Sequence, residues 1–93
     1  MKSIISTNEK CYVCETTINL HDHHIFFGVS KRTLSEKYGL KVYLCYEHHE
    51  GTNGVHGRNG DKLNRALKKL AQKKFKETYP NLSFIEIFGK EEV

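Results

Sequence analysis

The sequence predicts a small α+β domain that covers residues 1–93, is stapled by a zinc ion and carries a basic helix near its C-terminus. With 93 residues, 38% of them hydrophobic, and no Trp, the chain can build only a thin core, so we expect a cross-link. Its three cysteines are an odd number, which suits a mixed Cys/His metal site better than disulfides. Two strand-like segments and one long amphipathic helix complete the pattern of a zinc-stapled α+β domain.

The first half of the chain is predicted to hold a metal-binding turn, a strand and a short helix. Cys11 and Cys14 bracket a tight turn. Residues 23–29 (HHIFFGV) are rich in aromatic and branched side chains, a composition that predicts a strand. Residues 30–38 are expected to form a short helix or an ordered loop, which Gly39 closes.

A second strand and two helical segments follow. The strand is predicted at residues 41–44 (KVYL), antiparallel to the first, and a helical turn at residues 45–50 (CYEHHE) comes directly after it. A Gly-rich loop leads to the clearest helix, residues 61–78, for which Asn59 or Asp61 is the expected cap. Its apolar residues recur at helical spacing on one face, namely Leu63, Leu67, Leu70, Ala71 and Phe75.

The chain is expected to close with a short helix at residues 83–88. Pro80 ends the long helix before it, because proline cannot continue a helical ladder. Ser83 and Glu86 have the spacing of a capping box, and Gly89 is the expected stop.

Two short Cys/His motifs predict a structural zinc site. Two residues separate Cys11 from Cys14, and two residues separate Cys45 from His48 farther along the chain. Zn²⁺ takes four N or S ligands in a tetrahedron, and each short gap lets one turn present two of them. A lone CxxC could be a redox motif and buried free thiols are a further alternative, but neither accounts for two paired motifs.

Histidines outside these motifs form a second candidate metal site. Neighbours on a helical turn diverge by about 100°, so His49 faces the body of the domain if His48 faces the zinc. His23 and His24 on the first strand, together with His49 and His56, could then bind a divalent ion. The alternative is a set of exposed histidines that bind nothing.

Strand geometry limits which of these side chains can share a site. Neighbouring strand residues point to opposite faces of a sheet, so His23 and His24 meet only where the strand ends, bends or bulges. Otherwise the natural pairs are Asp22 with His24, or His21 with His23. Asp22 is therefore a reserve ligand.

The order of these motifs resembles the HNH (ββα-metal) endonucleases. It runs from CxxC through HHI on a strand and a hydrophobic strand ending in LC to CxxHH, a further His and a helix. The pattern is most similar to a small phage-encoded branch related to recombination-enhancing nucleases. The resemblance covers the zinc knuckles and the ββα core at residues 11–56, and the basic helix and C-terminal helix at residues 59–89 fit the same branch.

The resemblance also implies roles for the histidines. By position, His24 would be the general base that activates water, and His23 and His49 would bind one divalent ion such as Mg²⁺, Mn²⁺, Ni²⁺ or Zn²⁺. His56 would be a further ligand or a phosphate contact. A neutral imidazole can accept a proton at neutral pH, and a divalent ion relieves charge on the phosphate in the transition state.

A basic segment adds a candidate surface for nucleic acid. The formal net charge is +4, and residues 58–76 carry one acid, Asp61, among many Lys and Arg residues. Such a helix is suited to phosphate backbones, although a merely solvated face is the alternative. The predicted nucleic-acid contacts are Arg58, Lys62, Arg65, Lys68, Lys69 and Lys73.

Together these features predict a metal-dependent DNA endonuclease, phage-encoded, that hydrolyses phosphodiester bonds and nicks one strand per active site. The main alternative is a catalytically weak or inactive zinc-binding adaptor for nucleic acid or protein on the same scaffold. It is favoured by the lack of the family's central Asn in residues 30–42. A third alternative is a zinc-ribbon interaction protein without a second ion.

We expect DNA to be the partner, with a recombination protein of the phage or its host and a second copy of the chain as further candidates. The N-terminal residues lack the apolar segment of a signal peptide, and no apolar run approaches the roughly 18 residues that a membrane span needs. The expected location is therefore the reducing cytoplasm of the host cell, without a membrane.

Overall fold

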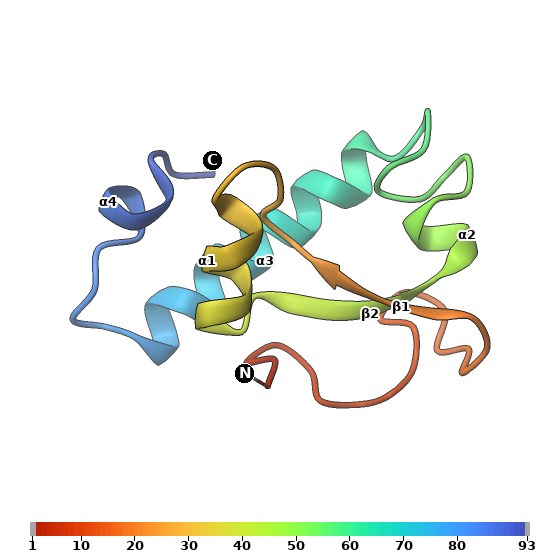
Figure 1. Cartoon of the computed structure of the whole chain (residues 1–93), viewed down its shortest axis with the longest axis horizontal. Coiled ribbons are helices and arrows are strands. Elements are labelled where there is room, and N and C mark those ends of the chain that lie inside the picture. The colour runs from red at the N-terminus through yellow and green to blue at the C-terminus, as the bar shows by residue number, and fades with distance from the viewer. Residues whose placement is uncertain (1, 93) are drawn as a thin grey trace.

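A two-stranded antiparallel sheet lies between helices on both sides (Figure 1). The structure is a computed structural model that describes residues 2–92. In chain order the elements are β1 (Leu20–His24), α1 (Lys31–Tyr38), β2 (Lys41–Cys45), α2 (Tyr46–His49), α3 (Asp61–Thr78) and α4 (Phe84–Phe88). The α+β class is therefore confirmed. Among residues 2–92, no helix is both long and apolar enough to cross a bilayer.

The strand predicted at residues 23–29 was placed too far along the chain. β1 pairs with β2 from Leu20, opposite Cys45, to His24, opposite Lys41. The ladder ends there because the buried Ser35 of α1 takes over the backbone groups of Phe26. The Ser35 hydroxyl accepts from Phe26 N at 3.0 Å and donates to Phe26 O at 2.7 Å.

The long helix α3 has the predicted bounds, and Leu67, Ala71 and Phe75 on its apolar face are buried. Its predicted cap is wrong, because Gly60 occupies the N-cap position and no side chain caps the helix there. The Gly57–Gly60 turn before α3 leaves no room for such a side chain, since a Cβ at Gly60 would overlap the carbonyl of Gly54.

Helices α1 and α4 have the predicted ends. Gly39 closes α1 at φ 73°, and its N–H donates to Ser35 O. In α4 the Ser83 hydroxyl accepts from Glu86 N at 3.3 Å, which is one half of the predicted capping box, and Gly89 follows at φ 90°.

The core lies between one face of the sheet, α3 and α4. Val42 and Leu44 of β2 are buried on the sheet face that also carries His21 and His23, because these residues pair across the ladder. At the other end, aromatic rings of α3 and α4 pack edge to face, with centroids of Phe75 and Phe84 5.4 Å apart. The sheet face that bears His23 is thus the face that packs on the core.

We predict that Ser35→Ala destabilises the domain by about 1–3 kcal/mol, because it leaves two buried backbone groups of Phe26 without partners. Urea denaturation measures this loss. Thr33→Ala, an exposed change on the same helix, is the control and should have little effect. Equal stability of the two variants would contradict the role given to Ser35.

Candidate metal centres

Cys11, Cys14, Cys45 and His48 come together with ligand atoms that all lie within 4.8 Å of one another. Cys14 Sγ is 3.7 Å from Cys45 Sγ, and His48 Nδ1 is 3.6 Å from Cys11 Sγ and 3.3 Å from Cys45 Sγ. A zinc tetrahedron has S–S edges of about 3.8 Å and S–N edges of about 3.5 Å. The four predicted ligands can therefore hold a metal ion, with spacings compatible with zinc.

Backbone hydrogen bonds hold this cluster against the sheet. Cys11 N donates to Thr16 O and Glu15 N donates to Cys11 O, which closes the first turn. Tyr12 N donates to Tyr43 O at 2.8 Å and so ties that turn to β2. Cys45 ends β2, and the following turn of α2 brings His48 back to the same point.

The cysteine environments favour a thiolate at Cys11. Burial opposes ionisation of Cys11, but hydrogen bonds from the backbone of Cys14, Cys45 and Val13 lower the pKa of its thiol to about 6. At Cys14 a hydrogen bond from the Thr16 backbone lowers the pKa, but desolvation and the neighbouring sulfurs outweigh it and raise the pKa. A bound cation would offset the repulsion between neighbouring thiolates and so favour their ionised forms.

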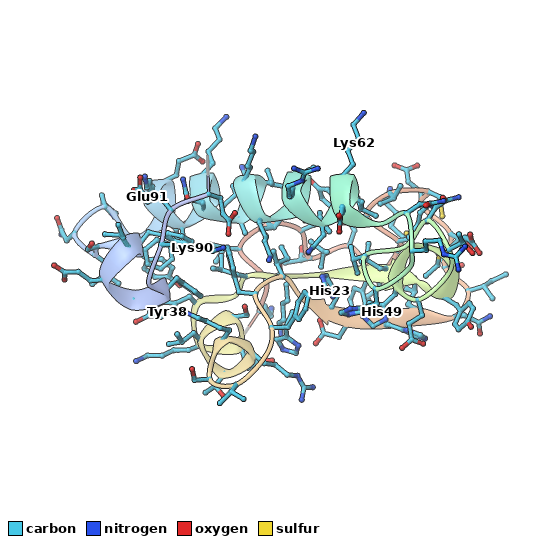
Figure 2. The ribbon with its side chains drawn as sticks, turned by 90° about the horizontal axis from the view of Figure 1, so that it is seen from above. His23, Tyr38, His49, Lys62, Lys90 and Glu91 are labelled. Atoms are coloured by element: carbon cyan, nitrogen blue, oxygen red, sulfur yellow. The ribbon has the colours of Figure 1, made fainter. Side chains whose placement is uncertain are left out.

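A second cluster gathers His23, His49 and His56, with one ligand atom of each within 4.8 Å of the others. The ring centroids of His23 lie 5.1 Å from His49 and 5.5 Å from His56 (Figure 2 labels His23 and His49). His56 reaches the cluster because its backbone N donates to His49 O at 3.0 Å. The loop needs glycine for this approach, since a Cβ at Gly57 would overlap the carbonyl of Gly51.

His23 has the properties of a metal ligand. Its side chain is 2% exposed, and its Nε2 has no hydrogen-bond partner among residues 2–92. Desolvation, followed by the nearby charges of His49, His56, His24 and Lys68, lowers the pKa of His23 to about 3. The imidazole is therefore neutral at physiological pH and keeps a free lone pair, as a ligand must.

The structure adds His21, which sequence reasoning had kept only as an alternative partner of His23. His21 Nδ1 lies 2.8 Å from His49 Nδ1, so one ring donates to the other. Metal-binding histidines usually make such a bond with the nitrogen that does not bind the ion. Desolvation and the charges of His56 and His21 lower the pKa of His49, which favours its neutral, metal-binding form. Strand alternation was the available signal for His21.

His24, the predicted base, lies on the opposite face of β1. Its Nε2 is 3.0 Å from Glu36 Oε1, and its Nδ1 accepts from Arg32 Nε at 3.4 Å. Asp22, the reserve ligand, joins His24 and Glu36 in a separate group, beside an open hollow of about 440 Å³ lined in part by His24, Arg32 and Lys37. The structure therefore does not bring His24 to the cluster of His23, His49 and His56, because β1 is regular through His24.

Most of the predicted nucleic-acid contacts also face away from the His cluster. Lys62, Arg65, Lys69 and Lys73 are exposed and recur every three or four residues, so they form one stripe along α3. Figure 2 shows Lys62 projecting from the side of α3 opposite to His23 and His49. The contacts outside this basic stripe are Arg58, exposed in the preceding loop, and Lys68.

Lys68 differs from the basic stripe because it is half-buried and turned toward the His cluster. Its ammonium group lies 5.5 Å from the centroid of the Phe27 ring, and that ring lies 4.9 Å from the ring of His56.

A scan against protein-family models and searches of curated proteins and of solved structures gave no match to this chain.

We predict that Cys11→Ser or Cys45→Ser loses one tightly bound zinc and leaves a largely unfolded chain. Structural zinc binding contributes about 10–16 kcal/mol, as much as the whole stability of a typical domain. Native mass spectrometry measures the zinc, and circular dichroism measures folding. His56→Ala removes a donor outside this cluster and should keep both. A cysteine variant that folds cooperatively without zinc would overturn the assignment.

Proposed function

We propose that the chain is a metal-dependent endonuclease of the HNH type, which hydrolyses phosphodiester bonds of DNA at the cluster of His23, His49 and His56. The observation that carries the proposal is the buried Nε2 of His23, which has no hydrogen-bond partner among residues 2–92 and lies beside the imidazoles of His49 and His56. His56 is exposed, so the cluster has an accessible side where a phosphate can approach. Three protein ligands with an open position are typical of catalytic rather than structural metal sites.

The second part of the proposal is a structural Zn²⁺ at the four-donor cluster of Cys11, Cys14, Cys45 and His48. Two features support it: the tetrahedral spacing of the donors and the closed set of three sulfurs and one nitrogen. Such a site adds the stability that a chain of 93 residues needs.

His23 and His49 have distinct roles in this proposal. A divalent ion held there would supply positive charge to the phosphate and lower the pKa of a water molecule. His23 offers a ligand nitrogen from β1, and its burial keeps solvent from competing for the ion. His21 fixes the ring of His49, so that the other nitrogen of His49 is free for the ion.

The resemblance implies that His24 is the general base, but its ring is engaged in other contacts. Both nitrogens have partners, Glu36 and Arg32, on the face of β1 away from the cluster. To take a proton at the cluster, His24 would have to leave these partners. The role of His24 is therefore separable from metal binding by experiment.

We expect His23→Ala and His49→Ala to lose the exchangeable divalent ion and the nicking of plasmid DNA, because each removes a ligand. His24→Ala should bind the ion normally, since its ring lies on the other face of β1. If His24 is the base, its nicking rate falls by about 10²–10⁴-fold. Calorimetric titration of Mn²⁺ or Mg²⁺ into zinc-loaded protein, beside a nicking assay, measures both effects.

Control measurements keep these outcomes apart. Zinc content should stay at one ion per chain in all three variants, because none changes the cysteine cluster. Wild-type protein that binds no second divalent ion, or that never nicks DNA with Mg²⁺, Mn²⁺ or Ni²⁺, would overturn the nuclease proposal. Loss of the ion in His24→Ala would overturn the separation of the two faces.

A second candidate function, a nucleic-acid adaptor without catalysis, is favoured by the direction of the basic stripe. Lys62, Arg65, Lys69 and Lys73 face away from the His cluster, so DNA bound along them is not delivered to it. Other lysines of α3 have acidic partners, Lys74 with Glu77 and Lys76 with Glu91, so the stripe offers the more available cations.

For the adaptor, we predict that replacing Lys69 and Lys73 together by Gln weakens binding to all DNA sequences alike. Each lost phosphate contact should reduce the slope of log affinity against log salt by about 0.9. Fluorescence anisotropy across a salt series measures both quantities. Lys2→Gln combined with Lys10→Gln removes the same charge outside α3 and is the control. Equal effects of the two double variants would show that only net charge matters.

A further inference from the structure

A small aromatic pocket adjoins the His cluster and belongs to neither metal site. Its volume is about 160 Å³, and it lies between the loop after β1, α3 and the C-terminal segment. Three phenylalanines, three lysines and one glutamate line it, namely Phe26, Phe27, Phe88, Lys31, Lys68, Lys90 and Glu92. Pockets for drug-sized ligands are about 300–1,000 Å³, so this aromatic pocket suits a single ring system.

Phe27 is the wall that the aromatic pocket shares with the His cluster. Its ring lies 4.9 Å from His56 and 5.9 Å from His23, measured between centroids. Phe26 and Phe88 are buried and pack on the core, whereas Phe27 is 40% exposed. An aromatic ring left at the surface beside three imidazoles offers a flat face to a ligand that reaches the cluster.

The charges around the aromatic pocket favour an anionic ligand. Lys31 is partly engaged, because its ammonium group donates to the carbonyl of Phe88. The Lys68 ammonium group lies over the ring of Phe27, and Lys90 extends from the C-terminal segment toward the middle of the domain (Figure 2). Glu92 is the acid among the lining residues, so the positive charges outnumber the negative.

We propose that the aromatic pocket receives the base of a nucleotide next to the phosphate at the His cluster. The base takes the place of the Lys68 ammonium group over the Phe27 ring, and Lys68 and Lys90 bind its phosphate. This inference rests on the proposed function and names its substrate class, which is DNA with an unpaired nucleotide at the cut. Bases in a duplex are stacked on both faces and must be extruded before they can enter such a pocket, whereas an unpaired base enters directly.

The test measures binding in zinc-loaded protein without any added divalent ion. The probes are a single-stranded oligonucleotide with one 2-aminopurine, whose fluorescence reports stacking, and a hairpin with the same base paired and a non-nucleotide linker as its loop, so that it offers no unpaired base. We expect tighter binding and a larger fluorescence change for the single strand. Phe27→Leu should weaken single-strand binding by about 5- to 140-fold, the worth of one stacked base, and leave hairpin binding unchanged.

Matched variants make the outcome specific to the aromatic pocket. Tyr12→Leu removes a ring of similar exposure, 42%, from the zinc knuckle and should bind like the wild type. Lys68→Gln should weaken single-strand binding more than Lys69→Gln does, because Lys69 belongs to the basic stripe and does not line the aromatic pocket. Phe27→Trp should retain the preference for the single strand, because it keeps an aromatic face. Unchanged hairpin binding by Phe27→Leu excludes misfolding as the cause of its loss.

The proposal is overturned if Phe27→Leu binds the single strand like the wild type, or if it weakens the single strand and the hairpin equally. Because no divalent ion is present, the result does not depend on cleavage. Suppose that the wild type prefers the single strand, that Phe27→Leu loses this preference, and that the wild type nicks no DNA. This result supports the base-binding role and contradicts only the nuclease proposal.

Discussion

The four-donor cluster of Cys11, Cys14, Cys45 and His48 is the constraint on which the rest of the molecule depends. Cys45 is at once the last residue of β2 and the N-cap of α2, so the cluster fixes where the sheet ends and the helical turn begins. Once His48 turns toward the sulfurs, the next residue must point elsewhere, because neighbours in a helix diverge by about 100°. His49 then faces β1, and the second cluster follows from the geometry of the first.

The pleat of β1 divides its histidines between two environments. His21 and His23 lie on the face toward α2, where the rings are crowded and His23 is buried. His24 lies on the face toward α1, where its Nε2–H donates a hydrogen bond to Glu36 and its Nδ1 accepts one from Arg32. The first face is suited to binding a cation through neutral nitrogens. On the second face, both ring nitrogens of His24 have hydrogen-bond partners, so His24 helps to hold α1 against β1.

Local signals in the sequence predicted the parts of the molecule that local interactions decide. The bounds of α3, the capping of α4 and the four-donor cluster follow from periodicity, caps and spacing. The end of β1 could not be predicted, because Ser35, from a different element, binds the backbone of Phe26. The same holds for the direction of the basic stripe and for the contact of His21 with His49, since both depend on how elements pack.

The Gly-rich loop between α2 and α3 has a consequence for how such a site can change over time. At Gly57 and Gly60 any larger residue would meet a carbonyl oxygen of the same loop, so these two positions are restricted to glycine. The backbone path of the loop is therefore constrained, whereas its exposed side chains, such as Arg58, are not. Diversification of the protein can occur at these loop side chains and around Phe27 without moving His56 away from His49.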